Sequence, residues 1–166
     1  MKYIFILLLI FNLSFAQNIS ELQSAAEQGN SNAQNNLGNA YLNGNGVTKN
    51  FHEAVKWYKL SANQGNIDAQ VNLGNMYSDG YGVRYNEEEA LRWYKLAADQ
   101  NDSEAQILIG KKYLYGGINI LINFKEAKEY FGKACDNGNQ QGCNLYKELN
   151  YVKDKANRNT EKFKIL

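Results

Sequence analysis

The stretch Ala26-Glu27-Gln28-Gly29-Asn30 recurs twice in this chain of 166 residues, each time after 36 positions. Its copies are Ala62-Asn63-Gln64-Gly65-Asn66 and Ala98-Asp99-Gln100-Asn101-Asp102. Further positions of the first copy recur in the same register: Ala33-Gln34, Leu37-Gly38, Tyr41, Gly44-x-Gly46-Val47, Ala54 and Trp57-Tyr58. Repetition at such a period is typical of stacked units, each of which is too small to bury its own apolar face.

Each copy is expected to form two antiparallel helices joined by a glycine turn. Asn and Asp are favoured at helix N-caps, because their side-chain oxygen accepts a bond from a free N–H of the first turn. Such residues precede the expected first helices at Asn30, Asn66 and Asp102, and the expected second helices at Asn50, Asn86 and Asn123. Glycine adopts positive φ without strain, which suits the turn between the helices. The pattern predicts an all-α fold, a right-handed α/α solenoid of helix-turn-helix repeats.

The register also sets the expected boundaries. They are a leader at 1–16, the start of a helix at 17–25, repeats at 26–61, 62–97 and 98–134, a truncated repeat or capping helix at 135–152, and a basic tail at 153–166. The third copy carries one extra residue and loses the glycine spacing at Ile118 to Ile122.

Residues 1–16 have the three parts of a secretory signal peptide. Lys2 is the charged start, Ile4 to Phe11 form the apolar run, and Ser14-Phe15-Ala16 is a small-x-small cleavage pattern. The alternative is a membrane anchor, but this run is shorter than the ~20 residues that a spanning helix needs. We expect cleavage after Ala16, a periplasmic or secreted product, and no transmembrane segment after cleavage. The formal net charge of +1 gives no electrostatic case for binding nucleic acid.

The recurring pattern resembles the Sel1-like repeat, a relative of the tetratricopeptide repeat. It is Ala-Glu-Gln-Gly-Asn-x-x-Ala-Gln-x-x-Leu-Gly-x-x-Tyr-x-x-Gly-x-Gly-Val, followed by Ala-x-x-Trp-Tyr, and the resemblance spans Ala26 to Tyr146. Thr48 and Arg84 stand where the family usually has Pro. The resemblance implies an all-helical scaffold that binds a protein or peptide. Because exported Sel1-like proteins can resemble immunity proteins, one specific role is neutralisation of an incoming toxin. A second hypothesis for such a scaffold is organisation of an envelope complex.

The spacing Cys135-x7-Cys143 resembles, more narrowly, the secreted Helicobacter cysteine-rich Sel1-like proteins. That resemblance implies a Cys135–Cys143 disulfide, which an even cysteine count behind a leader also favours. A zinc site is the alternative, but two thiols with no nearby His supply too few ligands.

The same resemblance implies a second function, a weak penicillin-binding β-lactamase (hydrolase) activity. The chain contains no Ser-x-x-Lys, Lys-Thr-Gly or His-Glu-x-x-His motif. We therefore name no catalytic residue, and an enzyme is the less expected alternative. No cofactor or metal is expected either, and we expect a monomer.

One face of the first helices is the expected binding surface. At 100° per residue, Ala33, Leu37 and Tyr41 share one arc and leave the opposite arc to other residues. Stacked as in tetratricopeptide proteins, these arcs would line a concave groove whose carboxamides bind a peptide backbone. The groove residues are Asn32, Asn35, Asn36 and Asn39 in the first repeat, Asp68, Val71, Asn72 and Asn75 in the second, and Glu104, Ile107, Leu108 and Lys111 in the third.

Two alternatives stay open for this face. The asparagines could be merely solvated residues of an Asn-rich protein. The apolar residues Ile107, Leu108 and Leu114 could pack on the fourth helix rather than on a partner. Separately, Asp99-Gln100-Asn101-Asp102-Ser103 resembles an acidic bacterial N-glycosylation acceptor. This makes Asn101 a candidate modification site, although a capped helix start explains the same residues.

Overall fold

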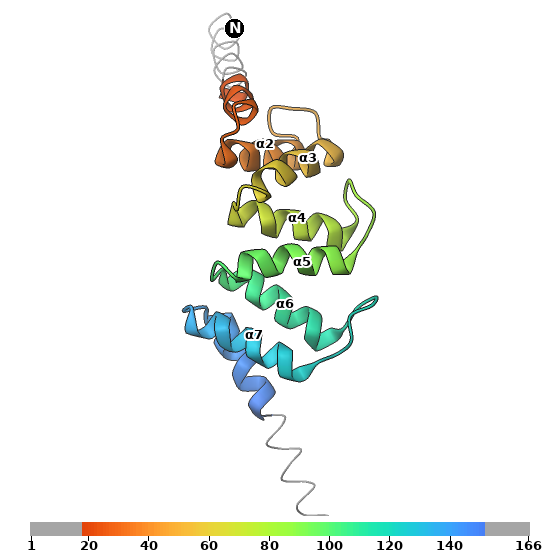
Figure 1. The fold of residues 1–166 in the computed structure, drawn as a ribbon, viewed down its shortest axis with the longest axis vertical. Coiled ribbons are helices and arrows are strands. Elements are labelled where there is room, and N and C mark those ends of the chain that lie inside the picture. The colour runs from red at the N-terminus through yellow and green to blue at the C-terminus, as the bar shows by residue number, and fades with distance from the viewer. Residues whose placement is uncertain (1–17, 152–166) are drawn as a thin grey trace, which may run out of the picture. The chain divides into compact units, whose positions relative to one another are not determined.

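The computed structural model describes residues 18–151, and apart from a two-residue bridge between Gly117 and Ile120 their regular structure is helical (Figure 1). The predicted leader and the residues from 152 onward lie outside the described residues. The helices are an N-terminal helix at 18–27, α2 (Ser31–Asn43), α3 (Phe51–Ala62), α4 (Ile67–Asp79), α5 (Glu87–Ala98), α6 (Ser103–Tyr115), α7 (Phe124–Asp136) and a C-terminal helix at 140–151.

The predicted N-caps set the starts of the helices. The side chains of Asn30, Asn66 and Asp102 accept bonds from the backbone N–H three residues later, at 2.9, 2.9 and 2.7 Å. Asn50 and Asn123 accept from the second and third residues after them, at the starts of α3 and α7. Each cap satisfies an otherwise unpaired N–H and stabilises its helix by about 1 kcal/mol. These five caps are confirmed.

The glycine turns allow a close approach of the backbone. Gly44 and Gly80 end α2 and α4 in the left-handed region, with φ of 78° and 73°. Gly82 has φ +67°, and a Cβ there would overlap the carbonyl group of Phe51 at the start of α3. Gly82 therefore serves both the turn conformation and the packing of this loop on the start of α3.

The chain divides after Asn86 into two compact units. In the first, α2 packs on α3 and α3 on α4. Its buried cluster contains Leu37 and Trp57, and Ile19 and Leu22 of the N-terminal helix pack against it. In the second, α5 packs on α6 and α6 on α7. Its buried cluster contains Ile107 and Phe131, covered by Leu145, Tyr146 and Leu149 of the C-terminal helix.

The glycine spacing lost in the third copy gives a different loop between α6 and α7. Gly116, with φ 72°, follows α6, and the backbones of Gly117 and Ile120 then exchange bonds at 3.0 and 3.2 Å. Asn119 takes φ 64° in the turn between them. The extra residue thus forms a small hairpin that has no equivalent in the first two copies.

The disulfide between Cys135 and Cys143 is present, with a Cα–Cα distance of 4.4 Å. It joins α7 to the C-terminal helix. Gly142 lies in the same contact, and a Cβ at this position would approach the Cβ of Ala134 to 2.7 Å. The predicted pairing is confirmed, and the two thiols are not available to a zinc ion.

Candidate binding site

Three equivalent buried glutamines each tie the first helix of a repeat to the helix that precedes it. Gln34, Gln70 and Gln106 are each at most 4% exposed. Their Nε2 atoms donate to the carbonyl oxygens of the residues eight positions earlier, Ala26, Ala62 and Ala98, at 3.0, 3.2 and 3.3 Å. Each of these carbonyls also accepts a backbone N–H three residues on, so the bond chiefly satisfies the buried glutamine amide. An unpaired buried amide would cost about 1–3 kcal/mol, which gives the recurrence of Ala-Gln in the sequence a structural cause.

A second amide network lies on α2 and its neighbours. The Tyr58 hydroxyl of α3 donates to Asn39 Oδ1 at 2.7 Å. Asn72 Nδ2 of α4 donates to Asn35 Oδ1 at 3.1 Å and to Asn39 Oδ1 at 3.5 Å. Burial raises the pKa of the Tyr58 hydroxyl well above its ordinary value of 10.0, so this group remains a hydrogen-bond donor even in alkaline solution. Asn39 is therefore held in a fixed orientation at the edge of α2.

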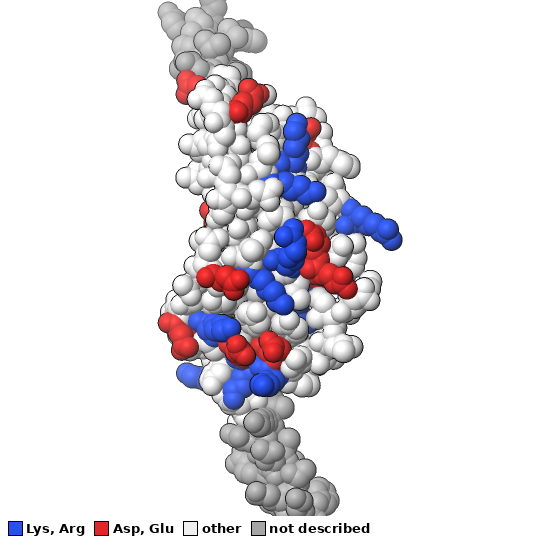
Figure 2. All heavy atoms as spheres, in the orientation of Figure 1, with Lys and Arg blue, Asp and Glu red and all other residues white. Residues whose placement is uncertain are grey.

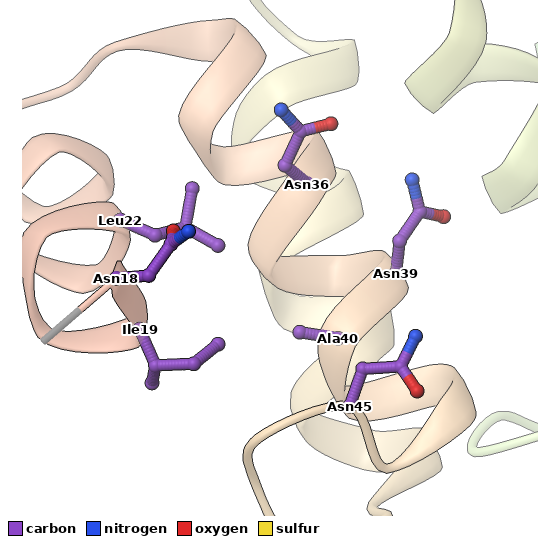
Figure 3. A pocket seen from close by; sticks show the side chains of 7 residues that line it. All are labelled: Asn18, Ile19, Leu22, Asn36, Asn39, Ala40 and Asn45. Carbon is purple, nitrogen blue, oxygen red and sulfur yellow. The ribbon is translucent and has the colours of Figure 1, made fainter. Parts of the chain in front are cut away.

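Next to Asn39 is a hollow of about 510 Å³, which we call the asparagine pocket. Its lining residues are Asn18, Ile19 and Leu22 of the N-terminal helix, Asn36, Asn39 and Ala40 of α2, and Asn45 of the following turn. Figure 3 shows the first three projecting toward α2, with the other asparagines on the facing side. The pocket thus places four carboxamides around an apolar wall.

The amides of the pocket differ in how they are used. Asn39 accepts bonds from Tyr58 and Asn72. Asn36 and Asn45 are exposed, and their side chains make no hydrogen bond within the described residues. A carboxamide can both donate and accept, which matches the alternating N–H and C=O groups of an extended peptide. Ile19, Leu22 and Ala40 can at the same time contact an aliphatic side chain.

The predicted groove residues fall into three groups by exposure. Asn32, Asn36, Asp68 and Glu104 are exposed, Asn39, Asn72, Asn75, Leu108 and Lys111 are half-buried, and Asn35, Val71 and Ile107 are buried. The predicted arc is wrong for the last group, which are 5%, 8% and 3% exposed. Helix α2 has neighbours on more than one side. It packs on α3, and it also bonds to α4, which itself packs on α3. A helical wheel drawn at 100° per residue with a single buried face does not account for this second neighbouring helix.

The apolar residues of the third repeat are explained by internal packing. Ile107 belongs to the buried cluster with Phe131, and Leu114 packs against that cluster. Leu145 and Leu149 of the C-terminal helix cover the same cluster. Ile107 and Leu114 therefore pack within the protein together with the C-terminal helix, which is the second of the two alternatives left open by the sequence.

Sequence reasoning missed five lining residues of the asparagine pocket, one of which, Ala40, was not placed on the predicted face of its helix. Asn18, Ile19 and Leu22 precede the first repeat, and Asn45 lies between the two turn glycines. An apolar pair in an amphipathic stretch before the first cap was the available signal for the N-terminal helix. Nothing in the sequence indicated that Asn45 would turn toward it.

Two further candidate residues, His52 and Asn101, are both exposed. His52 is exposed in the first turn of α3, and residues 18–151 contain no group of three or more His, Cys, Asp and Glu side chains that could hold a metal ion. Asn101 is exposed, with φ 65°, in the turn between α5 and α6, and its carbonyl oxygen accepts a bond from Asn137 Nδ2 at 3.2 Å. Its glycosylation stays a prediction.

Charged side chains of both signs are interspersed on the face shown in Figure 2. Several form ion pairs with neighbours on their own helix, such as Glu89 with Arg92 and Glu129 with Lys133. None of the helices between residues 18 and 151 combines the length and apolar character that crossing a bilayer requires.

The family model of the Sel1 repeat matches residues 31–66, 67–102 and 103–139. The chain belongs to the Sel1 repeat family. The matched Sel1 repeats begin at the first helix of each pair, five residues later than the boundaries chosen from the sequence. Both choices contain the same helices, because a tandem repeat has no unique starting point.

Several solved Sel1 repeat structures are similar. A protective antigen of uropathogenic Escherichia coli has a TM-score of 0.77 and 36% identity over 86% of this chain and 30% of that chain. A Sel1 repeat protein from Oxalobacter formigenes has a TM-score of 0.70 and 34% identity over 82% of this chain and 54% of the other. Helicobacter pylori cysteine rich protein B has a TM-score of 0.60 and 22% identity over 76% of this chain and 96% of its own, which is a likeness of fold.

Among curated proteins, an uncharacterized protein of Haemophilus influenzae is 55% identical over 29 residues, which are 18% of this chain and 56% of that protein. The chain thus spans between about a third and about a half of the length of these first relatives.

Proposed function

We propose that this Sel1 repeat chain is an exported scaffold that binds an extended peptide segment of a partner protein in the asparagine pocket. The observation that carries the proposal is the pair of unused carboxamides, Asn36 and Asn45, beside the apolar side chains of Ile19 and Leu22. The ligand is a segment in extended conformation with at least one aliphatic side chain.

The geometry supports recognition that tolerates many ligand sequences. Carboxamides that bond to a peptide backbone do not select side chains, whereas the apolar wall selects one aliphatic residue. The buried Tyr58–Asn39 bond holds one amide in place before the ligand arrives, which lowers the conformational entropy lost on binding. Toxin neutralisation and assembly of an envelope complex are two roles that such a pocket could serve.

Export is supported by the leader pattern at 1–16 together with the disulfide. Disulfides persist in oxidising compartments such as the periplasm and the extracellular space. The peptide ligand would therefore belong to an extracytoplasmic protein.

The test uses residues 17–166 with the disulfide intact. Peptides are selected from a displayed random library, and the affinity of the best binder is measured by calorimetry for the parent and for the double variant Asn36→Ala/Asn45→Ala. The matched control is Asn43→Ala/Asn63→Ala, which removes two exposed asparagines that do not line the pocket. Asn39 is left unchanged because it belongs to an internal network.

We expect the pocket variant to lose at least about tenfold in affinity and the control to keep the parent value, since each lost backbone bond is worth roughly 0.5–1.5 kcal/mol. Unchanged affinity of the pocket variant would overturn the proposed site. Failure of the library to yield any saturable binder would overturn peptide binding itself.

A further inference from the structure

The loop between α6 and α7 exposes a concentration of large apolar side chains. Leu121 is 86% exposed, Ile118 66% and Phe124 62%, and Tyr115 and Ile122 are exposed as well. The ten residues 115–124 contain no charged side chain. The loop follows the end of α6 and extends beyond the helix ends in Figure 1. Scattered apolar residues are ordinary on protein surfaces, but five within ten positions mark an interaction surface.

The backbone of this loop is prepared for strand pairing on one edge. The N–H and C=O groups of Ile120 both bond to Gly117, at 3.2 and 3.0 Å. Because successive residues of an extended chain direct these groups to opposite edges, those of Leu121 face away from the hairpin. Leu121 makes no hydrogen bond within the described residues. An unpaired edge beside exposed apolar side chains is a template for another strand.

The sequence of the loop identifies which strand fits. Residues 119–123, Asn119-Ile120-Leu121-Ile122-Asn123, read the same in both directions. In an antiparallel pair centred on Leu121, each residue of one copy lies opposite an identical type in the other. Ile120 then faces Ile122, and Leu121 faces the same residue of the other copy, while the asparagines lie just outside the paired residues. Since the segment is uncharged, two copies meet without like-charge repulsion.

We infer that residues 120–122 pair with the same residues of a second copy of this chain, in an antiparallel arrangement with two-fold symmetry at Leu121. Asn119 in the hairpin turn and Asn123, whose N–H bonds to the Tyr113 carbonyl at 2.8 Å, bound the paired segment. Because the N–H and C=O groups of Leu121 point outward, Leu121 of one copy and Leu121 of the other form a hydrogen-bonded pair. The Cα–Cα distance in such a pair is about 5.5 Å. The exposed side chains Ile118 and Phe124 flank this pair and add apolar contact.

A second copy fits this loop better than a lipid surface does. The turn of the hairpin contains Asn119, whose carboxamide would enter the apolar layer of a membrane first. Lys125 after the loop is followed at once by Glu126, and Lys112 before the loop forms an ion pair with Glu87 at 2.7 Å, so the attraction of the loop for anionic lipid is weakened. Strand pairing instead leaves both asparagines at the wet ends of the paired segment.

The dimer is expected to be weak, because a short two-stranded contact is small compared with the interfaces of stable complexes. It differs from the monomer expected on sequence alone, where the exposure of the loop could not be seen. It is also independent of the asparagine pocket, which lies in the other compact unit.

The experiment measures the oligomeric state of residues 17–166 by sedimentation over a concentration series. The variant Leu121→Lys places two like charges opposite each other at the symmetry axis. Its control is Leu96→Lys, which changes an exposed leucine of α5 outside the loop. A second pair of variants, Leu121→Cys and Leu96→Cys, is oxidised and examined on a non-reducing gel.

We expect a concentration-dependent dimer for the parent and for Leu96→Lys, a dissociation constant at least tenfold higher for Leu121→Lys, and covalent dimers from Leu121→Cys in large excess over Leu96→Cys. A parent that stays monomeric together with Leu121→Cys that links no faster than Leu96→Cys would overturn the inference. A monomer that co-sediments with phosphatidylglycerol vesicles through Leu121 would overturn it in favour of a lipid surface.

Discussion

Tyr58 shows how one residue and its contact change together between repeats. Its hydroxyl is buried and bonds to Asn39 in the first repeat. At the same positions of the third repeat stand Phe131 and Lys111, so the donor and the acceptor are both absent. Phe131 packs over Gly110 as Tyr58 packs over Gly38. The ring is thus required by packing in both repeats, and the hydroxyl only where an acceptor faces it.

This environment predicts a specific alkaline sensitivity. Burial raises the pKa of Tyr58 above 10.0, so the folded state keeps a proton that the unfolded state releases. The contribution to stability is complete below pH 10 and is lost as the pH rises above it. Tyr58→Phe should therefore make the free energy of unfolding fall less steeply above pH 10, by up to about 1.4 kcal/mol per pH unit.

Urea unfolding between pH 9 and 11.5 measures this slope. Tyr81→Phe removes the hydroxyl of an exposed tyrosine in the same unit and is the control. An identical slope for Tyr58→Phe and parent would contradict the assigned burial of the hydroxyl.

At the scale of elements, the C-terminal helix depends on a covalent link. It covers the cluster of Ile107 and Phe131 with three side chains, and the Cys135–Cys143 bridge ties it to α7. Closing a loop of about nine residues stabilises by about 2.5 kcal/mol in the chain-entropy model. Without the bridge, the described contacts that hold this helix are chiefly those three side chains, so it is the first element expected to open.

The variant Cys135→Ser/Cys143→Ser should lose about 2–3 kcal/mol of stability. Its amide hydrogen exchange should rise first in residues 140–151, while α2 and α3 keep the protection of the parent. Uniform loss of protection over all helices would show that the bridge acts on the whole fold instead.

The sequence predicts elements better than it predicts faces. The caps and the glycine turns were predictable because each depends on residues within one turn of the chain. The bridge was predictable because the resemblance and the cysteine count indicated the same pair. The burial of Asn35 and Val71 was not, since it depends on a neighbouring helix more than 30 positions away. The asparagine pocket was missed in part for the same reason, because the N-terminal helix supplies one wall.

At the scale of the whole molecule, the predicted export would decide in which compartment a partner is met. The predicted cleavage after Ala16 leaves Gln17 as the first residue, directly before the helix that lines the pocket. Expressed in a bacterium with a secretion pathway, the protein should be recovered from the periplasm or medium. Intact mass and N-terminal sequencing should give residues 17–166 with two protons fewer than the reduced chain.

A variant Leu7→Arg/Leu8→Arg interrupts the apolar run and serves as the control for export. It should stay inside the cell with Met1 and free thiols. Recovery of the parent with an intact leader inside the cell would contradict the predicted signal peptide.

Side-chain hydrogen bonds of the same kind join neighbouring repeats. Asn66 Nδ2 bonds to Asn32 and Gln64 Nε2 to Gln34 across one junction, and Asn139 Nδ2 bonds to Ser103 and Asn137 Nδ2 to Gln106 across another. A repeat gained by gene duplication would find, on both of its sides, the hydrogen-bonding groups with which it already pairs. Such chains can therefore gain or lose whole repeats in evolution. The N-terminal helix, the C-terminal helix and the hairpin between α6 and α7 are not bound by this requirement and can diverge.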